Sequence, residues 1–427
     1  MSLIKRIINV GGLTLISRVL GFARDILMAS ALGAGLAADA FFIAFKLPNF
    51  FRRLFAEGAF TAGFVPLFAK RLGRGADGKE QAISFASKTL GVFLPTLLLV
   101  LALFEISMPW VMELLTGGFD EAEPQKFDLV VKLARITFPY LLLISLVTLL
   151  AGVLNGLGKF SAAAFAPVFL NICMIAGLLF WPGGAVHSAT TLAIAVSIAG
   201  IVQLLWLLIA VWRANITITL PKPKLTPSIK QLVKVAGPAA VGAGIMQINL
   251  LVDLLIAARM LPEGSISYLF YADRLNQLPI GIIGVAIGTV LLPSISKALG
   301  AGDTAGAQSQ QNRAMEFALF LTLPAAAALM VMPQELISSL FERGAFTSVD
   351  TTAAAMALVA YASGLPAYVV IKVLTPGFFA RQNTKTPVKI AIFSLILNTS
   401  LNLILIIPLA HVGLALATSI AAWVNAA

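Results

Sequence analysis

The sequence is poor in the residues that metal sites and disulfides need. It contains one cysteine, Cys173, and two histidines, His187 and His411, among 427 residues. One thiol excludes an intramolecular disulfide and a cysteine-based metal cluster, and two histidines leave little for a zinc or haem site. The sequence also lacks a G-x-x-x-x-G-K-[ST] motif, so ATP hydrolysis through a P-loop is excluded. We therefore expect neither a metal ion nor a bound cofactor.

Charge is scarce as well. Charged residues make up 11% of the chain, against about 25% in soluble domains. Hydrophobic residues make up 59%, and the mean hydropathy is +0.95. This composition excludes an ordinary cytosolic enzyme, a disordered tail and a fibrous repeat. The apolar residues fall in long blocks, which indicates an all-α polytopic membrane protein.

The apolar blocks are long enough to be membrane-spanning helices, which need roughly 20 residues each. They are too long and too continuously apolar for the strands of a barrel. The first is no cleavable signal peptide, because charges interrupt it. We predict twelve spans, over residues 7–32, 38–69, 85–115, 129–157, 160–182, 189–212, 229–261, 266–296, 314–333, 351–379, 388–409 and 412–427.

Basic residues concentrate in alternate loops. The loops on the side of the N-terminus contain Lys5, Arg6, Lys70, Arg71, Arg74, Lys79, Lys159, Arg213, Lys222, Lys224, Lys230, Lys297, Arg313, Arg381, Lys385 and Lys389. The opposite loops hold chiefly acids, with Lys126 and Arg343. The positive-inside rule then places the N-terminus in the cytoplasm. Topology accounts for the net charge of +11, so no nucleic acid is expected as a partner.

The two halves of the chain resemble each other. Four pairs of identical residues lie 227 positions apart: Pro66 and Pro293, Lys70 and Lys297, Pro139 and Pro366, and Asn171 and Asn398. Six spans separate the copies, so both have the same orientation, as in the parallel repeats of several transporters. We predict an N-terminal lobe over 1–220 and a C-terminal lobe over 221–427, facing each other across a central cavity. Block 412–427 is shorter than its counterpart 189–212, so we expect the chain to stop within its twelfth helix.

Several ionisable residues fall inside the predicted spans. They are Arg18, Arg24, Asp25, Asp39, Lys46, Arg52, Arg53, Glu57, Asp253, Arg259, Asp273 and Arg274. Each charge at the bilayer centre costs at least about 2.5–3.5 kcal/mol, so such residues face the protein interior or a wet cavity. Structural ion pairs remain an alternative, because Arg24 adjoins Asp25 and Asp273 adjoins Arg274.

Four of the arginines are predicted to be functional: Arg18, Arg24, Arg52 and Arg274. Cations that converge in one cavity repel each other unless an anion shares it. The guanidinium group binds phosphate oxygens in a bidentate manner without losing its proton. The sequence therefore predicts a cationic cavity for a phosphate-bearing substrate, with transport driven by an ion gradient, the membrane potential or the substrate gradient.

Three segments carry a family resemblance. Residues 15–69 ("LISRVLGFARDILMASALGAGLAADAFFIAFKLPNFFRRLFAEGAFTAGFVPLFA") closely resemble the N-terminal signature of the MurJ (MviN) lipid II flippases of the MOP exporter superfamily. "YADRLNQLPIGIIGVAIGTVLLPSISK" and "VLTPGFFARQNTKTPVKIA" resemble later signatures. The resemblance implies a bacterial inner-membrane protein of peptidoglycan synthesis. Its substrate would be lipid II, an undecaprenyl-pyrophosphate-linked disaccharide-pentapeptide carried to the periplasmic leaflet.

The resemblance also implies roles for single residues. The family's cavity arginines fall on Arg18, Arg24, Arg52 and Arg274, and its gating or charge-partner positions on Asp25, Asp39, Glu57, Asp273 and Lys372. Two positions depart from the pattern, since Gln277 replaces a glutamate and Met356 lies where some members have an arginine. Members usually have two further helices, 13 and 14, which are absent from this sequence.

Three other functions remain possible from the sequence. A MATE-type drug antiporter has the same two-lobe plan but would need an acidic cavity. A non-transporting scaffold would tolerate neutral substitutions in the cavity. A flippase for another polyprenyl-pyrophosphate-linked glycan is the nearest alternative. We expect a monomer whose other partners are membrane lipids.

Overall fold

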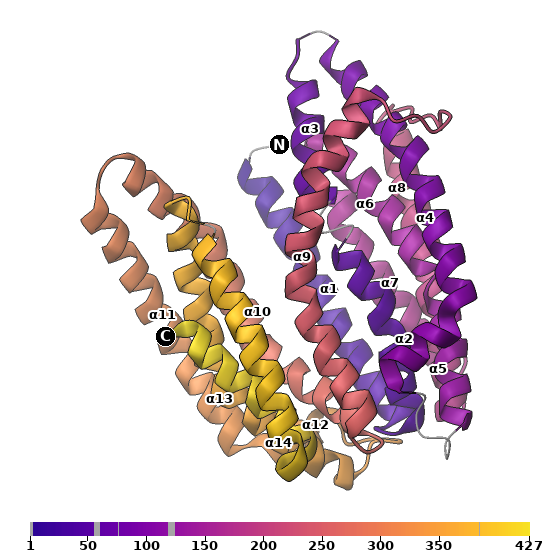
Figure 1. The fold of residues 1–427 in the computed structure, drawn as a ribbon, viewed down its shortest axis with the longest axis vertical. Helices are drawn as coiled ribbons and strands as arrows, with labels where there is room; N and C mark the ends of the chain where they lie inside the picture. Colours follow the sequence, from indigo (N-terminus) through magenta and orange to yellow (C-terminus); the bar gives the residue numbers. More distant parts are fainter. Residues whose placement is uncertain (1–2, 55–59, 76, 118–123, 384) are drawn as a thin grey trace. The chain divides into compact units, whose positions relative to one another are not determined.

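The computed structural model describes residues 3–54, 60–75, 77–117, 124–383 and 385–427, and all regular secondary structure in these ranges is helical (Figure 1). The chain forms two compact units. The first contains residues 1–32 and 36–251, and the second contains residues 33–35 and 252–427. The predicted lobes meet at 220/221, whereas the compact units divide inside helix α9 (Pro227–Met260).

The N-terminal unit contains eight of the described helices and the first part of a ninth. They are α1 (Leu3–Leu32), α2 (Leu36–Phe51), α3 (Thr61–Leu72), α4 (Gly78–Thr116), α5 (Pro124–Thr137), α6 (Tyr140–Gly156), α7 (Ser161–Phe180), α8 (Ala185–Arg213) and the start of α9 (Pro227–Met260). Helix α8 packs against α1, α2, α5, α6 and α7, and α1 packs along α7. The α1–α7–α8 group therefore forms one continuous layer of this unit.

The C-terminal unit contains the end of α9 and five further helices. They are α10 (Ser265–Gly300), α11 (Thr304–Val331), α12 (Pro333–Phe341), α13 (Ser348–Ala380) and α14 (Lys385–Ala426). Helix α13 is the centre of the unit and contacts α10, α11, α12 and α14. Thr347 begins α13 with a capping box, in which its side chain and that of Asp350 each hydrogen-bond the backbone N–H of the other.

Seven helical segments in the described ranges are long and apolar enough to cross a membrane. They cover Gly78–Thr116, Pro124–Gly156, Ser161–Phe180, Ala185–Arg213, Thr304–Val331, Ser348–Ala380 and Lys385–Ala426. Many large apolar side chains on these helices are exposed. Such a surface is expected of helices that contact lipid rather than water. The prediction of an all-α polytopic membrane protein is confirmed.

The predicted spans coincide with helices, with two differences. Span 129–157 is two helices, α5 and α6, because a turn at Phe138–Pro139 interrupts it. Pro139 lacks the backbone N–H that would continue the ladder. Span 38–69 covers α2 and α3, and the residues between them are only partly described. The short helix α12 was not predicted. The predicted break near 410 is confirmed, since Ala410 has non-helical angles (φ 48°, ψ −129°) inside α14.

Aromatic rings form the core of the N-terminal unit. The rings of Phe60 and Phe64 stack with centroids 4.6 Å apart, and Phe64 stacks on Phe68 and on Phe85 at 5.6 Å and 5.4 Å. The guanidinium of Arg71 lies 4.0 Å from the centroid of Phe85. Burial, and then the charge of the neighbouring Arg74, lower the pKa of Arg71. The core thus reaches the basic end of α3.

The turn between α1 and α2 belongs to the C-terminal unit. Gly33 has φ +65°, and a Cβ on it would lie 2.5 Å from the carbonyl oxygen of Ala345. The Tyr271 hydroxyl donates to the carbonyl of Gly33 at 3.5 Å, and its ring contacts Phe341 and Phe346. Only glycine fits this left-handed, closely packed position. Residues 33–35 therefore form the turn, and α2 begins directly after them.

Candidate functional site

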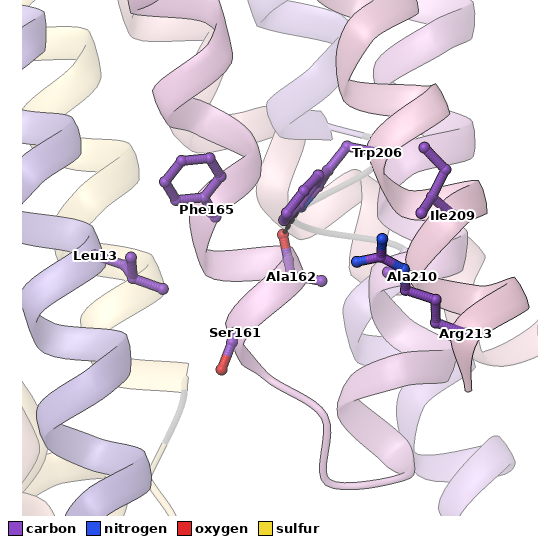
Figure 2. A pocket seen from close by; sticks show the side chains of 8 residues that line it. All are labelled: Leu13, Ser161, Ala162, Phe165, Trp206, Ile209, Ala210 and Arg213. Carbon is purple, nitrogen blue, oxygen red and sulfur yellow. Dashed lines mark hydrogen bonds between the residues drawn. The ribbon is translucent and has the colours of Figure 1, made fainter.

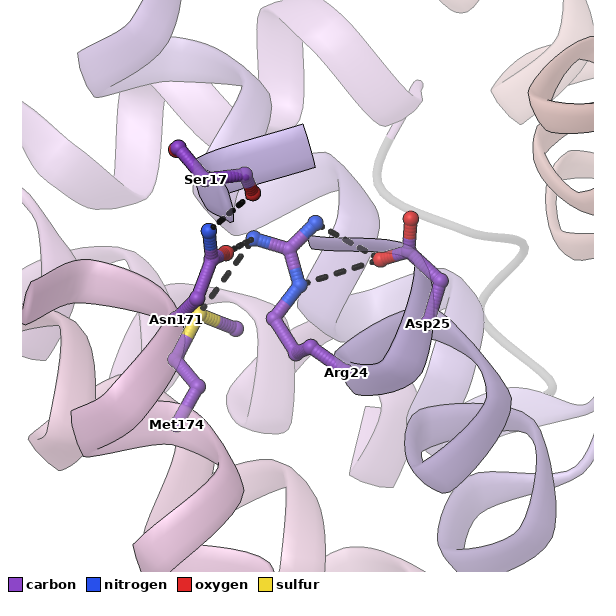
Figure 3. A network of polar contacts seen from close by, with 5 residues as sticks. All are labelled: Ser17, Arg24, Asp25, Asn171 and Met174. Atoms are coloured by element: carbon purple, nitrogen blue, oxygen red, sulfur yellow. Dashed lines mark hydrogen bonds and ion pairs between the residues drawn. The ribbon is translucent and has the colours of Figure 1, made fainter. Parts of the chain in front are cut away.

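Arg24 and Asp25 form a buried polar cluster on α1 (Figure 3). The side chain of Arg24 is embedded, with 7% of the residue exposed, and Asp25 is 2% exposed. Arg24 Nη2 and Nε donate to Asp25 Oδ1 at 2.6 Å and 3.0 Å. This geometry corresponds to the structural ion pair that the sequence left open, with the carboxylate of Asp25 against the guanidinium of Arg24.

Asn171 of α7 completes the cluster. Its Oδ1 accepts a hydrogen bond from Arg24 Nη1 at 3.0 Å, and its Nδ2 donates to the carbonyl of Ser17 at 2.9 Å (Figure 3). Met174 Sδ lies 3.9 Å from the same Nη1. Gly21 of α1 faces the Asn171 amide, and a Cβ on it would lie 3.6 Å away, at ordinary contact distance. Four donor–acceptor contacts therefore fix the direction of the Arg24 guanidinium.

Arg18 lies on the same helix in different surroundings. Its side chain is exposed, whereas Arg24 is buried. Six residues correspond to about 240° of rotation around a helix with 3.6 residues per turn, so the two side chains leave α1 in different directions. Arg18 is therefore open to the surroundings of the N-terminal unit.

The second predicted span provides a cation and an acid. Arg52, just past the end of α2, is half-buried, and its Nε donates to Asn49 Oδ1 at 3.2 Å. Asp39, in the first turn of α2, is 2% exposed. The positive end of the helix dipole stabilises a carboxylate in the first turn. Glu57 lies outside the described residues.

The C-terminal unit contains Asp273 and Arg274 on α10. Arg274 is half-buried, and its guanidinium carbon lies 4.7 Å from the ring centroid of Phe270. Asp273 accepts a hydrogen bond from the side-chain amide of Gln277, one turn later. Gln277 lies at the position where some family members carry a glutamate. Its neutral amide gives the Asp273 carboxylate a hydrogen bond without adding a second negative charge. Lys372 is exposed on α13.

A second polar cluster in this unit was not predicted. Asp253 Oδ1, on α9, accepts hydrogen bonds from Asn398 Nδ2 at 2.9 Å and from Asn402 Nδ2 at 2.6 Å. Both asparagines are buried on α14, at 2% and 0% exposure. The spacing of four places both amides on one helix face, and this is the signal in the sequence that could have revealed them.

The described residues contain no group of three or more histidine, cysteine, aspartate or glutamate side chains that could hold a metal ion. In the N-terminal unit the structure brings Arg24, Asp25 and Asn171 together, and Arg52 joins Asn49 at the end of α2. In the C-terminal unit it brings Asp253 to two asparagines and Asp273 to Gln277. In each arrangement a charged side chain has a polar or oppositely charged partner within hydrogen-bond distance.

Comparisons with known proteins agree on one family. The family model described as "Lipid II flippase MurJ" matches residues 28–427. A "Probable lipid II flippase MurJ" of Rhizobium meliloti is 49% identical over 430 residues, covering 100% of this chain and 79% of the relative. The corresponding protein of Rhizobium tropici is 46% identical over 431 residues, covering 100% of this chain and 80% of the relative. This chain thus spans about four fifths of their length.

Solved structures show the same fold. A lipid II flippase MurJ in an inward closed conformation matches with a TM-score of 0.83 and 30% identity, covering 98% of this chain and 85% of that one. An inward-facing multidrug resistance MATE transporter of the MOP superfamily matches with a TM-score of 0.79, covering 96% and 92%. At 20% identity, this second match shows a similar fold and nothing about function. The family match, the high identity along the whole chain and the shared fold lead to one conclusion: the chain belongs to the lipid II flippase MurJ family.

Proposed function

We propose that this protein is a transporter that moves lipid II from the cytoplasmic to the periplasmic leaflet of the bacterial inner membrane by alternating access. The observation that carries the proposal is the family match over residues 28–427, with relatives 46–49% identical along the entire chain. Helices long and apolar enough to cross a bilayer support a multi-pass membrane protein. The N-terminus is proposed to lie in the cytoplasm, because alternate loops carry the lysines and arginines.

The residues proposed to contact the substrate are Arg18, Arg24 and Arg52 of the N-terminal unit and Arg274 of the C-terminal unit. The pyrophosphate of lipid II offers oxygens that match the planar fork of guanidinium groups. The exposure of Arg18 and the half-buried positions of Arg52 and Arg274 support direct contact with a phosphate. Asp39, Glu57, Asp273 and Lys372 are proposed to act as charge partners during the conformational change.

Arg24 requires an exchange of partners. Its guanidinium is bound to Asp25 at 2.6 Å and to Asn171 at 3.0 Å. Breaking a buried ion pair without a replacement costs about 3–5 kcal/mol. A phosphate can replace the Asp25 carboxylate, because it offers the same kind of anionic oxygen. We infer that Asp25 holds Arg24 until the pyrophosphate takes over the contact.

The energy source is proposed to be the membrane potential, with no resident cofactor. A net charge that moves with the substrate or the empty carrier gains about 2.3 kcal/mol per 100 mV. The protein is proposed to work as a monomer in contact with membrane lipids. No nucleic acid takes part in this cycle.

The experiment is a sidedness assay for lipid II in cells that depend on this protein. With Arg18→Ala, Arg52→Ala or Arg274→Ala as the only copy, lipid II should accumulate in the inner leaflet. Arg343→Ala is the matched control, because this arginine is exposed and its guanidinium donates a hydrogen bond to the carbonyl of Ser339. Normal translocation by all three cavity variants would refute the phosphate site. Normal translocation in cells depleted of the protein would refute the function.

A further inference from the structure

The N-terminal unit contains a groove of about 320 Å³ between α1, the start of α7 and the end of α8. Leu13 of α1, Phe165 of α7 and the Trp206 and Ala210 side chains of α8 form its walls (Figure 2). Arg213, the last residue of α8, is the charged residue of the lining. None of the residues assigned to lipid II above takes part in the groove.

The walls of the groove are fixed by contacts within the unit. Trp206 Nε1 donates a hydrogen bond to the carbonyl of Ala162 at 3.0 Å (Figure 2). The Trp206 ring also lies 5.5 Å from the ring of Phe165 and 5.4 Å from that of Phe169. The hydrogen bond at the indole nitrogen and the two phenylalanine contacts together prevent the Trp206 ring from rotating into the groove. The groove is therefore preformed.

The groove favours an apolar occupant. Buried water needs two to four polar partners, and these walls are nearly all hydrocarbon. Ile209, which also lines the groove, is 44% exposed, and Trp212 near it is 75% exposed, so this part of α8 presents a large apolar surface that suits contact with lipid. A lipid-facing apolar groove fills with an acyl chain. Its volume is near the lower end of the roughly 300–1,000 Å³ typical of small-ligand sites, which suits one acyl chain better than a whole undecaprenyl tail.

Positive charge lies at the same end of the unit. Arg213 is exposed, and Lys159, two residues before the start of α7, is exposed as well. Each basic residue near a membrane surface attracts anionic lipid by about 1 kcal/mol, and guanidinium binds phosphate oxygens directly. We propose that the groove is a site for an anionic phospholipid, with one acyl chain along Phe165 and Trp206 and the phosphate on Arg213. The site is separate from the proposed lipid II path and stands without it.

The groove contains its own fluorophore, which allows a direct test. The full chain is reconstituted in vesicles with Trp206 as the only tryptophan, the other four being replaced by phenylalanine. Phosphatidylglycerol or phosphatidylcholine with brominated acyl chains is then added at equal mole fractions. Bromine quenches tryptophan on contact. We expect Trp206 to be quenched more strongly by phosphatidylglycerol, and Arg213→Gln to lower this preference about fivefold.

Matched variants separate the groove from the bulk bilayer. A chain with Trp212 alone should show equal quenching by both lipids. Ala210→Leu, which fills the groove without changing charge, should reduce quenching of Trp206 by both. Equal quenching of Trp206 by the two lipids, or a preference that Arg213→Gln leaves unchanged, would overturn the proposal. Displacement of brominated phosphatidylglycerol by substoichiometric undecaprenyl phosphate would assign the groove to a prenyl lipid and overturn it too.

A second measurement uses the unmodified sequence. Phosphatidylglycerol with a photoactivatable acyl chain should crosslink within residues 161–165 and 206–213, and excess unlabelled phosphatidylglycerol should suppress the product. Crosslinks spread evenly over the lipid-facing helices would contradict a defined site, whether or not the single-tryptophan proteins fold.

Discussion

Asn171 and Asn398 lie 227 residues apart, and each hydrogen-bonds a charged side chain on a helix of its own unit. Asn171 accepts from Arg24 of α1 at 3.0 Å, whereas Asn398 donates to Asp253 of α9 at 2.9 Å. An amide has both an acceptor oxygen and a donor nitrogen, so one side chain suits either sign of charge. Both halves therefore contain an asparagine that hydrogen-bonds a charged side chain. The charged side chain is an arginine in the N-terminal unit and an aspartate in the C-terminal unit.

Replacing Asn171 by leucine should destabilise the N-terminal unit. The change removes the acceptor for Arg24 Nη1 and the donor to the Ser17 carbonyl. A buried donor without a partner costs about 1–3 kcal/mol. We expect a lower midpoint of thermal unfolding in detergent. Ile172→Leu, at the exposed neighbouring position, is the control and should leave the midpoint unchanged. A midpoint in Asn171→Leu equal to that of the wild type would contradict the cluster.

Replacing Asp25 by alanine should be more harmful than replacing both members of its ion pair. Alone, Asp25→Ala leaves the Arg24 guanidinium charged at 7% exposure, with a cost of about 3–5 kcal/mol. Adding Arg24→Met removes that charge and should restore much of the stability. Unfolding midpoints of the two single variants and the double variant form the test.

The same double variant separates stability from transport. If Arg24 binds pyrophosphate, the stable double variant should still fail to move lipid II. Additive losses of stability would refute the buried pair. Full translocation by the double variant would remove Arg24 from the substrate site.

Asp253 should anchor α14 to α9. Both Asn398 and Asn402 donate to the same oxygen, at 2.9 Å and 2.6 Å. A hydrogen bond to a charged group contributes about 1.5–3 kcal/mol, so Asp253→Ala should strongly lower the unfolding midpoint. Asp253→Asn keeps an acceptor oxygen and should lower it less. An equal effect of the two variants would show that the hydrogen bonds contribute little.

Gly33→Ala should perturb the turn after α1. The position has φ +65°, and the new Cβ would meet the Ala345 carbonyl oxygen at 2.5 Å. We expect a loss of at least about 1 kcal/mol of stability from backbone strain and displacement. Gly184→Ala is the control, because nothing lies within 4 Å of its Cβ and its φ is −64°. Equal midpoints of thermal unfolding for Gly33→Ala and Gly184→Ala would refute the predicted strain at Gly33.

Hydropathy and charge predicted most of the helices because membrane spans are encoded locally. The turn at Phe138–Pro139 was missed because proline is common within transmembrane helices, and its presence alone does not locate a break. The short helix α12 has nine residues, too few to register as a span. The kink at Ala410 was predicted because the apolar blocks on its two sides are distinct.

The sequence identified the charged residues within the spans but did not identify their distant partners. Their rarity in apolar blocks identified Arg24 and Asp253 as residues of interest. Their partners lie 147 and 145 positions away, at Asn171 and Asn398, and only tertiary packing brings them together. The repeat picked out both asparagines without indicating what they bind. Proximity in sequence did suggest the pairing of Arg24 with Asp25, and the structure has it.

The two halves of α14 are joined through one residue, Ala410, with φ 48° and ψ −129°. A connection this short leaves no polar loop that could wait at the membrane surface while the first half is inserted. The two halves instead pack on each other directly, and the Ser394 hydroxyl of the first half donates to the Ala421 carbonyl of the second at 3.1 Å. Because glycine adopts positive φ without penalty, Ala410→Gly would relieve the backbone strain of this reversal, whereas a β-branched residue at this position would increase it.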